Sequence, residues 1–262
     1  MRANMVAWAL AALTAFGAAA MGEVKTREVE YRHGDVALRG FLAWDDAKKG
    51  RRPGVLIVHE WWGHNEYART RARMLAQMGY TALAVDMYGE GKTTKHPMEA
   101  GQMANAVRMN LENWRGRALA GLEVLKAQPQ CDKSRIAAIG YCFGGSTVLQ
   151  LALAGADLKA VASFHGALPR PTEAEAKQVK AAILVCHGAD DSFIPEEVIK
   201  TFRGTLDKAG AKYDFVAYPG VRHSFTVPDA DSHGIPGLKY DKKADEDSWR
   251  RLKELLAAKL GK

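Results

Sequence analysis

The sequence contains few cysteines: Cys131, Cys142 and Cys186 are the three in a chain of 262 residues. No two of them form a C-x-x-C pair, which argues against a thiol-redox protein. Cys131 precedes a predicted strand that ends at Cys142, so about ten residues at roughly 3.3 Å each would hold the two about 30 Å apart, far beyond the ~7 Å reach of a disulfide. Cys186 lies within an apolar run and is expected to be a small buried side chain. We therefore expect no disulfide framework.

Concentrated charge of one sign is also missing. Lys and Arg number 37 against 30 Asp and Glu, which gives a net charge of +7 at pH 7. The basic residues are scattered in short groups, and no aromatic side chains alternate with them. This distribution is typical of a solvated basic surface, so we do not expect the protein to bind nucleic acid.

Long hydrophobic runs are absent apart from one near the N-terminus. The basic residue Arg2 precedes an apolar stretch at 5–16, and the three alanines at 18–20 offer an A-x-A cleavage site. This order is typical of a secretory signal peptide, and the apolar stretch is too short to span a membrane. A retained N-terminal anchor is the alternative. We predict a signal peptide at 1–20 and a bacterial protein that is periplasmic or secreted, with no membrane attachment after cleavage.

Repeats, low-complexity segments and linkers are absent as well, so residues 21–262 are predicted to form a single domain. Apolar strands alternate with helices along this part of the chain. The predicted strands are 27–33, 36–44, 53–59, 81–86, 135–141, 160–164, 181–186 and 213–217, and the predicted helices are 67–78, 98–126, 145–154, 196–209 and 240–260.

This alternation predicts an α/β fold with a mainly parallel, doubly wound sheet and helices on both faces. The first two strands alternate like a hairpin and are expected at one edge of the sheet. The interval 167–182 is too short for a cap domain, so we expect an open site suited to a small substrate.

Residues 139–145, Ile-Gly-Tyr-Cys-Phe-Gly-Gly, match the G-x-S-x-G nucleophile elbow, with Cys142 in place of serine. The elbow is a strained strand-to-helix turn whose neighbours two residues away must lack Cβ, and Gly140 and Gly144 meet that need. The N-terminus of the following helix favours a thiolate at Cys142. The alternative is a tight glycine turn with an inert cysteine.

The loops beyond the carboxyl ends of parallel strands are where active residues gather in such a sheet. Reading those loops gives Cys142, Asp191 and His223, in the chain order nucleophile, acid, histidine that is typical of α/β-hydrolases. His223 is predicted to transfer the proton, and Asp191 to fix the tautomer and orientation of His223. Asp190 is the competing acid.

The backbone N–H groups of Trp61 and Phe143 are predicted to form an oxyanion hole, which would stabilise the negative charge of a tetrahedral intermediate. The loops at this edge of the sheet also carry Trp62, Tyr88 and Arg222. We name these three side chains as candidate substrate contacts.

The segment His-Glu-Trp-Trp-Gly-His is similar to the zinc motif H-E-x-x-H but has one residue too many. His59 and His64 are five positions apart and Gly63 interrupts the segment, so the two imidazoles cannot share a helical face. We therefore predict no metal site and no organic cofactor. His165 and His187 end predicted strands and are interpreted as core or supporting groups.

Five segments together resemble the dienelactone hydrolase family of α/β-hydrolases, and the resemblance extends from about residue 27 to the C-terminus. The segments are HEWWG, DMYG, GYCFGG, HGADDSFIP and YPGVRHSF. The resemblance implies that Cys142, Asp191 and His223 form the catalytic triad. It further implies that Glu60 contacts the thiol and takes its proton when substrate displaces the carboxylate.

The sequence departs from this family at the residues that hold the substrate's charge. Members that act on dienelactone bind its carboxylate with two arginines, and the matching positions here are Glu90 and Val227. Because one position is acidic and the other apolar, we expect neutral esters or lactones to be preferred over carboxylated ones. Arg222 and Lys92 are the alternative cations.

The sequence as a whole predicts a monomeric hydrolase of small carboxylic esters or lactones that works through an acyl-cysteine intermediate. Two alternatives come from other classes. One is a thiol-redox protein, which the missing C-x-x-C disfavours. The other is a non-catalytic binding module on the same fold, which the intact triad disfavours.

Overall fold

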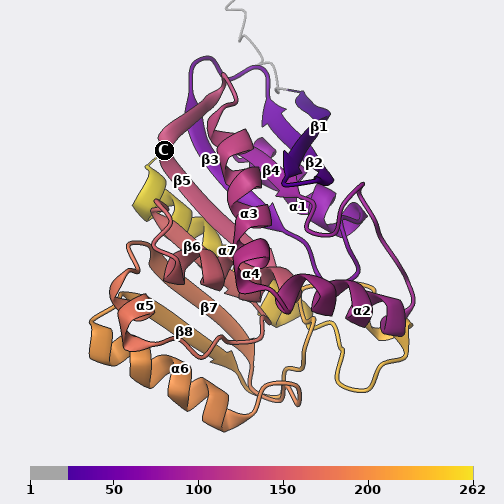
Figure 1. The fold of residues 1–262 in the computed structure, drawn as a ribbon, viewed down its shortest axis with the longest axis vertical. Coiled ribbons are helices and arrows are strands. Elements are labelled where there is room, and N and C mark those ends of the chain that lie inside the picture. Colours follow the sequence, from indigo (N-terminus) through magenta and orange to yellow (C-terminus); the bar gives the residue numbers. More distant parts are fainter. Residues whose placement is uncertain (1–22, 262) are drawn as a thin grey trace, which may run out of the picture.

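One sheet of eight strands runs through the part of the chain that the computed structural model describes, residues 23–261 (Figure 1). The signal peptide predicted at 1–20 lies outside the described residues and stays a prediction. The strands are β1 (Val24–His33), β2 (Val36–Asp45), β3 (Arg52–Val58), β4 (Thr81–Val85), β5 (Cys131–Tyr141), β6 (Ala160–Phe164), β7 (Ala182–Gly188) and β8 (Tyr213–Tyr218).

The strand order is β1-β2-β4-β3-β5-β6-β7-β8. β2 pairs antiparallel with β1 and with β4, and every pairing from β4 through to β8 is parallel. The predicted mainly parallel sheet with a hairpin at one edge is therefore confirmed. Since the parallel strands share a direction, the loops after β3, β5, β7 and β8 all emerge at one edge of the sheet.

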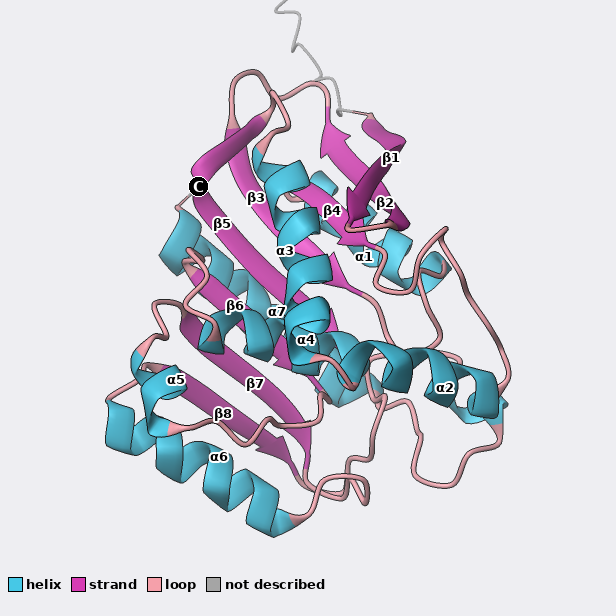
Figure 2. Cartoon of the chain, viewed as in Figure 1, coloured by secondary structure: helices cyan, strands magenta, loops and turns pink. Residues whose placement is uncertain are grey.

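Helices cover both faces of the sheet (Figure 2). They are α1 (Glu66–Gln77), α2 (Pro97–Arg108), α3 (Leu111–Lys126), α4 (Phe143–Leu153), α5 (Glu173–Lys177), α6 (Glu196–Ala209) and α7 (Lys242–Leu260), with one 3-10 turn, η1 (Ala230–His233). Val55 and Ile57 of β3 belong to the core cluster under α1 and α7, whereas the alternate residues Leu56 and Val58 belong to the cluster under α3 and α4. A strand buried on both sides explains its unbroken apolar sequence.

The predicted helix at 98–126 is wrong in one respect, because the structure divides it into α2 and α3. Asn110 is extended, with φ of −120°, and its side-chain oxygen accepts a hydrogen bond from Asn113 N at 2.8 Å. This side chain caps the start of α3, which favours ending one helix and starting another over a single continuous helix. The break leaves Arg108 at the C-terminal end of α2.

The interval between β6 and β7 holds the short helix α5, which the sequence did not predict. Thr172 and Glu175 form a capping box there, each side chain bonding the backbone N–H of the other. No inserted domain occupies this interval, as expected from its length. Within residues 23–261, no helix is both long and apolar enough to cross a membrane.

Candidate active site

A sharp turn between β5 and α4 presents Cys142. Its φ of 51° lies in the left-handed region, which is uncommon for a residue with a side chain and stores strain. Cys142 N donates to Phe164 O at 3.0 Å, and Cys142 O accepts from Ser146 N at 3.2 Å. These bonds to β6 and α4 hold the cysteine in a conformation that it would not adopt alone.

The turn needs its flanking glycines because the chain passes very close to itself. A Cβ at Gly140 would lie 2.1 Å from Gly144 O, and a Cβ at Gly144 would lie 2.1 Å from Val58 O. Both contacts are with backbone and cannot be relieved by a rotamer change. The glycine spacing in the sequence therefore has the structural cause that the elbow pattern predicts.

The loops after β7 and β8 bring Asp191 and His223 together. His223 Nδ1 donates to Asp191 Oδ2 at 2.6 Å, and Asp191 Oδ1 accepts from Phe193 N at 2.9 Å. Asp191 and His223 are both buried, as expected for a charge-assisted pair. Asp190 instead points to the surface and accepts from Gly220 N at 3.2 Å. The structure thus places Asp191, and not its neighbour, against the imidazole.

Cys142 is the other neighbour of His223 in the site. Burial alone would lower the pKa of His223, but its interactions with Cys142 and Asp191 outweigh burial and raise this pKa to about 10. The raised pKa favours the protonated imidazole at neutral pH. This is an arrangement suited to nucleophilic catalysis.

A cavity of about 290 Å³ opens beside Cys142. Its lining is mostly apolar and comprises Trp61, Arg108, Cys142, Ala167, Phe193, Ile194, His223, Ile235 and Leu238. The volume is near the lower end of the range for ligand pockets, about 300–1,000 Å³. The ring of Phe193 stands edge-on to that of His223, with centroids 5.3 Å apart, and is half exposed. The cavity fits a small, largely apolar molecule placed against the sulfur.

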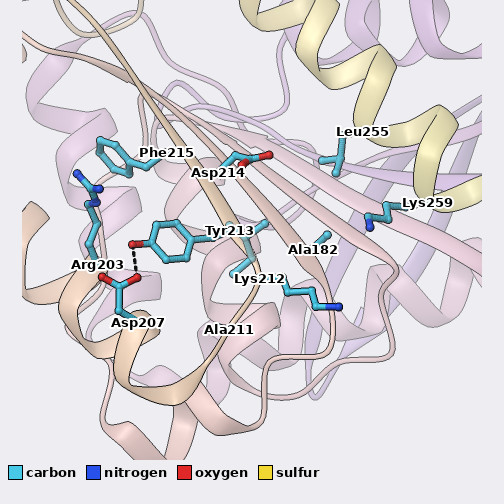
Figure 3. A pocket seen from close by; sticks show the side chains of 11 residues that line it. Ala182, Arg203, Asp207, Ala211, Lys212, Tyr213, Asp214, Phe215, Leu255 and Lys259 are labelled. Carbon is cyan, nitrogen blue, oxygen red and sulfur yellow. Dashed lines mark hydrogen bonds between the residues drawn. The ribbon is translucent and has the colours of Figure 1, made fainter.

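A different hollow of about 530 Å³ lies where β7 and β8 begin, and Figure 3 shows its lining. Its lining includes none of Cys142, Asp191 and His223. Tyr213 donates from its hydroxyl to Asp207 Oδ1 at 2.7 Å, and the Arg203 guanidinium carbon lies 5.3 Å from the centroid of the Phe215 ring. The chemistry-bearing groups are therefore in the cavity at Cys142, not in this hollow.

A sequence model of the Dienelactone hydrolase family matches residues 38–260, which is most of the chain. The chain belongs to the dienelactone hydrolase family. Membership makes the protein a hydrolase that acts on esters or lactones. The fold described above, with its elbow after β5, is the α/β-hydrolase fold that this family implies.

This dienelactone hydrolase family member is also similar to individual proteins along most of its length. A crystal structure of a dienelactone hydrolase-like promiscuous phosphotriesterase from metagenomic libraries is 39% identical, with a TM-score of 0.89, and the match covers 92% of this chain and 100% of the other. Protein usf of Aquifex pyrophilus is 27% identical over 226 residues, which cover 84% of this chain and 93% of that protein. A Salmonella typhimurium protein, named provisionally as a carboxymethylenebutenolidase, is 28% identical over 233 residues, or 85% of this chain and 83% of its own.

Glu60 follows β3 and is almost fully buried. Its Oε1 accepts from Ser224 Oγ at 3.0 Å and lies 3.9 Å from His165 Nδ1. Burial raises the pKa of Glu60 to about 7 and Asp229 adds to the rise, while the charge of His223 and the hydrogen bond from Ser224 oppose it. Within residues 23–261, no lysine or arginine comes within ion-pair distance of this carboxylate.

Resemblance to the dienelactone hydrolase family implies that Glu60 contacts the thiol. The structure instead shows a hydrogen bond between Glu60 and Ser224. Glu60 borders a separate hollow together with Tyr67 and Val227, and it is not among the residues that line the cavity at Cys142. The carboxylate nevertheless lies close enough to His223 for the two charges to affect each other.

Glu60→Gln is expected to change how stability depends on pH. The folded-state pKa of about 7 exceeds the ordinary value of 4.5, so between these values the folded protein binds a proton that the unfolded chain releases. The free energy of unfolding therefore falls as pH rises through this window. From pH 5 to 7.5, the wild type should lose about 2 kcal/mol relative to the variant.

Urea unfolding of both proteins at the two pH values measures this difference. The buried His64 and His165, whose pKa values burial lowers, act in the opposite direction but equally in both proteins, so they cancel. The exposed carboxylate of Glu66 provides the control, and Glu66→Gln should track the wild type. Parallel curves for wild type and Glu60→Gln would contradict the expectation.

None of the three candidate substrate contacts lines the cavity at Cys142. Trp62 is buried and its ring stacks on that of His233, with centroids 4.1 Å apart. The Tyr88 hydroxyl donates to Trp61 O at 3.0 Å, so Tyr88 supports the backbone of a lining residue from beneath. Arg222 is exposed, whereas the adjacent His223 is buried, so the two side chains point in different directions.

The two predicted oxyanion-hole residues do lie beside Cys142. Phe143 is the first residue of α4, so its N–H has no partner within the helix. Trp61 lines the cavity with Cys142. The position of these groups is suited to the predicted role, which stays a prediction.

The family's substrate-binding positions, Glu90 and Val227, are also away from this cavity. Glu90 is on the surface and pairs with Lys92 at 3.5 Å, so Lys92 is engaged elsewhere. Val227 is buried in a small cluster with Trp62. The arginine that does line the cavity is Arg108, which sequence reasoning missed because it lay inside a predicted continuous helix.

A buried network that the sequence did not reveal supports the loop after His223. Arg71 of α1 donates to Thr226 O at 3.0 Å and pairs with Asp245 of α7 at 2.7 Å. The Thr226 hydroxyl is hydrogen-bonded to Tyr67 Oη at 2.7 Å and to His165 Nε2 at 2.8 Å. Two helices and the end of β6 thus fix this loop.

The two histidines of the segment His59–His64 each bond backbone. His59 Nε2 accepts from Met87 N at 3.2 Å, and His64 Nε2 donates to Ala84 O at 3.1 Å. In the stretch from 23 to 261, no three His, Cys, Asp or Glu side chains are grouped so that they could hold a metal ion.

Proposed function

We propose that the protein hydrolyses small carboxylic esters or lactones with Cys142 as nucleophile, through an acyl-cysteine intermediate. The observation that carries this proposal is the buried hydrogen bond between Asp191 and His223, together with the placement of His223 and Cys142 in the lining of one apolar cavity. An acid, a histidine and a thiol in this arrangement are the groups that nucleophilic catalysis uses.

In the first half of the reaction, the Cys142 sulfur attacks the carbonyl carbon and the carbonyl oxygen becomes an oxyanion. The N–H groups of Trp61 and Phe143 stabilise this charge. The carbon–oxygen bond to the leaving group then breaks, and His223 gives its proton to the departing alkoxide. The acyl group stays on sulfur, with His223 neutral and Asp191 holding its Nδ1–H.

In the second half, neutral His223 accepts a proton from water, and the resulting hydroxide attacks the thioester carbon. The carbon–sulfur bond breaks and the carboxylic acid leaves. His223 is again protonated, which its raised pKa favours, and Cys142 is free to attack the next substrate. Substrate and one water molecule, together with the groups of the chain, balance these steps.

The acyl-cysteine intermediate is the part of this proposal that can be measured directly. Rapid mixing with 4-nitrophenyl acetate should release a burst of 4-nitrophenol close to one equivalent, because acylation by an activated ester outpaces deacylation. Intact-mass measurement after an acid quench should show one added acetyl group, and peptide mapping should place it on Cys142. Steady turnover with no adduct at any time would contradict the covalent route.

One comparison favours a second candidate activity. The solved structure that is 39% identical to this chain is described as a promiscuous phosphotriesterase. We propose that the same cavity and the same sulfur can attack a neutral phosphotriester. The same quench and peptide map, with a phosphotriester as substrate, should then find a phosphoryl group on Cys142, and no release of its alcohol would refute this candidate.

A further inference from the structure

Arg108 is an arginine that borders the cavity at Cys142, and two stacked rings hold it there. Its guanidinium carbon lies 5.1 Å from the centroid of the Phe143 ring and 5.9 Å from that of Trp114. These rings stack on each other with an interplanar angle of 18°, and Trp114 Nε1 donates to Thr147 Oγ1 at 2.8 Å. The side chain is therefore positioned by groups that are themselves fixed.

Neither ring offers a hydrogen-bond acceptor to the N–H groups of the guanidinium. Among residues 23–261, Arg108 forms no ion pair and no side-chain hydrogen bond, whereas Arg71 and Arg115 pair with Asp245 and Glu175. An arginine presents its N–H donors in the plane of the group, in a fork that matches a carboxylate. The edges of Arg108 are thus unpaired beside a largely apolar cavity.

The position of Arg108 also indicates which part of a substrate it would meet. Phe143, whose ring it covers, directly follows the nucleophile and carries one of the proposed oxyanion donors. A charge bound by Arg108 therefore lies near the acyl carbon that Cys142 attacks. The remaining lining offers no second charge to such a group, apart from His223 and Cys142 themselves.

We propose that Arg108 is a specificity-determining residue that binds a carboxylate on the acyl part of the ester or lactone substrate. The inference rests on the proposed function, since it assigns the substrate class of that site. It replaces the expectation, drawn from Glu90 and Val227, that neutral substrates are preferred, because those two positions do not line the cavity and Arg108 does.

The test uses two matched esters, the 4-nitrophenyl monoester of terephthalic acid and its methyl ester. The para-substituted ring prevents the free carboxylate from attacking its own ester and offers no activated double bond for the thiol to add to, so 4-nitrophenol release reports the enzyme. The wild type should prefer the charged ester by at least about tenfold in kcat/KM, which corresponds to about 1.4 kcal/mol. The preference should shrink as salt is raised, because ions screen the attraction.

Arg108→Gln should lower kcat/KM for the charged ester by about 30-fold or more and change that for the methyl ester by less than about threefold. Arg108→Lys, which keeps the charge but loses the fork, should retain part of the preference. Arg203→Gln is the matched control, because Arg203 also lies over an aromatic ring but lines the hollow in Figure 3. It should leave both rates unchanged.

The outcomes separate the two proposals. If the wild type hydrolyses neither ester, the proposed function fails and the inference fails with it. If the wild type hydrolyses the methyl ester as well as or better than the charged one, only the inference fails. Equal losses for both esters in Arg108→Gln would also overturn it, since they would show that Arg108 supports the site and does not read the substrate's charge.

Discussion

Ester hydrolysis by Cys142→Ala should fall by about 10⁵-fold or more, to the small residual rate that binding and oxyanion stabilisation alone provide. The sulfur is the atom that would form the bond to substrate, and no other nucleophile lines the cavity among the described residues. The measurement is kcat for 4-nitrophenyl acetate, together with the loss of the acyl adduct. Turnover close to that of the wild type would end the covalent mechanism.

Two control variants belong with this experiment. Because Cys142 is partly exposed and alanine accepts the same backbone, the alanine variant should unfold within about 1 kcal/mol of the wild type. Cys131→Ala removes a buried thiol under Gly54, far from the site, and should keep full turnover. Together they show whether the loss in Cys142→Ala reflects chemistry or a general effect of removing a thiol.

Asp191→Asn should lower kcat by about 10⁴-fold, as removal of the charge from the equivalent acid does in serine proteases. The amide can donate to His223 Nδ1 and so favours the wrong tautomer. The variant also removes the charge that helps to keep the pKa of His223 high. Asp190→Asn is the matched control one residue away, and its effect should stay within severalfold, because Asp190 bonds only Gly220.

The pH dependence of kcat shows whether Asp191→Asn acts through the charge and tautomer of His223 or simply through loss of folding. In Asp191→Asn, loss of the favourable contact should move the pKa of His223 down, so the remaining activity should titrate at lower pH than that of the wild type. A larger loss in Asp190→Asn than in Asp191→Asn would mean that the acid is assigned to the wrong residue.

The sheet and the elbow could be predicted because their causes are local. A strand buried on both faces, such as β3, must be apolar throughout, and the close approach of Gly140 to Gly144 leaves no room for side chains. Cys142, Asp191 and His223 follow β5, β7 and β8, so the order of these strands along the chain sets the order of the three residues. Because the three strands are parallel, their carboxyl ends bring these residues to the same end of the sheet.

Other parts of the site depend on contacts that no local pattern records. Ser224 meets Glu60 across 164 positions of sequence, so the partner of that carboxylate was not predictable. Trp61 and Trp62 are neighbours, yet the first lines the cavity at Cys142 and the second stacks on His233. Which of two adjacent aromatic residues faces a cavity is decided by packing of the assembled loops and not by composition.

The division of α2 from α3 has a consequence for how this enzyme could diversify. Arg108 lies at the C-terminal end of helix α2, whereas Cys142, Asp191 and His223 lie in the segments that follow strands β5, β7 and β8. Inserting or deleting one residue of α2 ahead of Arg108 would turn the arginine by about 100° around the helix axis and withdraw it, without touching the strands. Substrate choice and bond cleavage thus reside in separable modules, and selection can alter the first while the second is conserved.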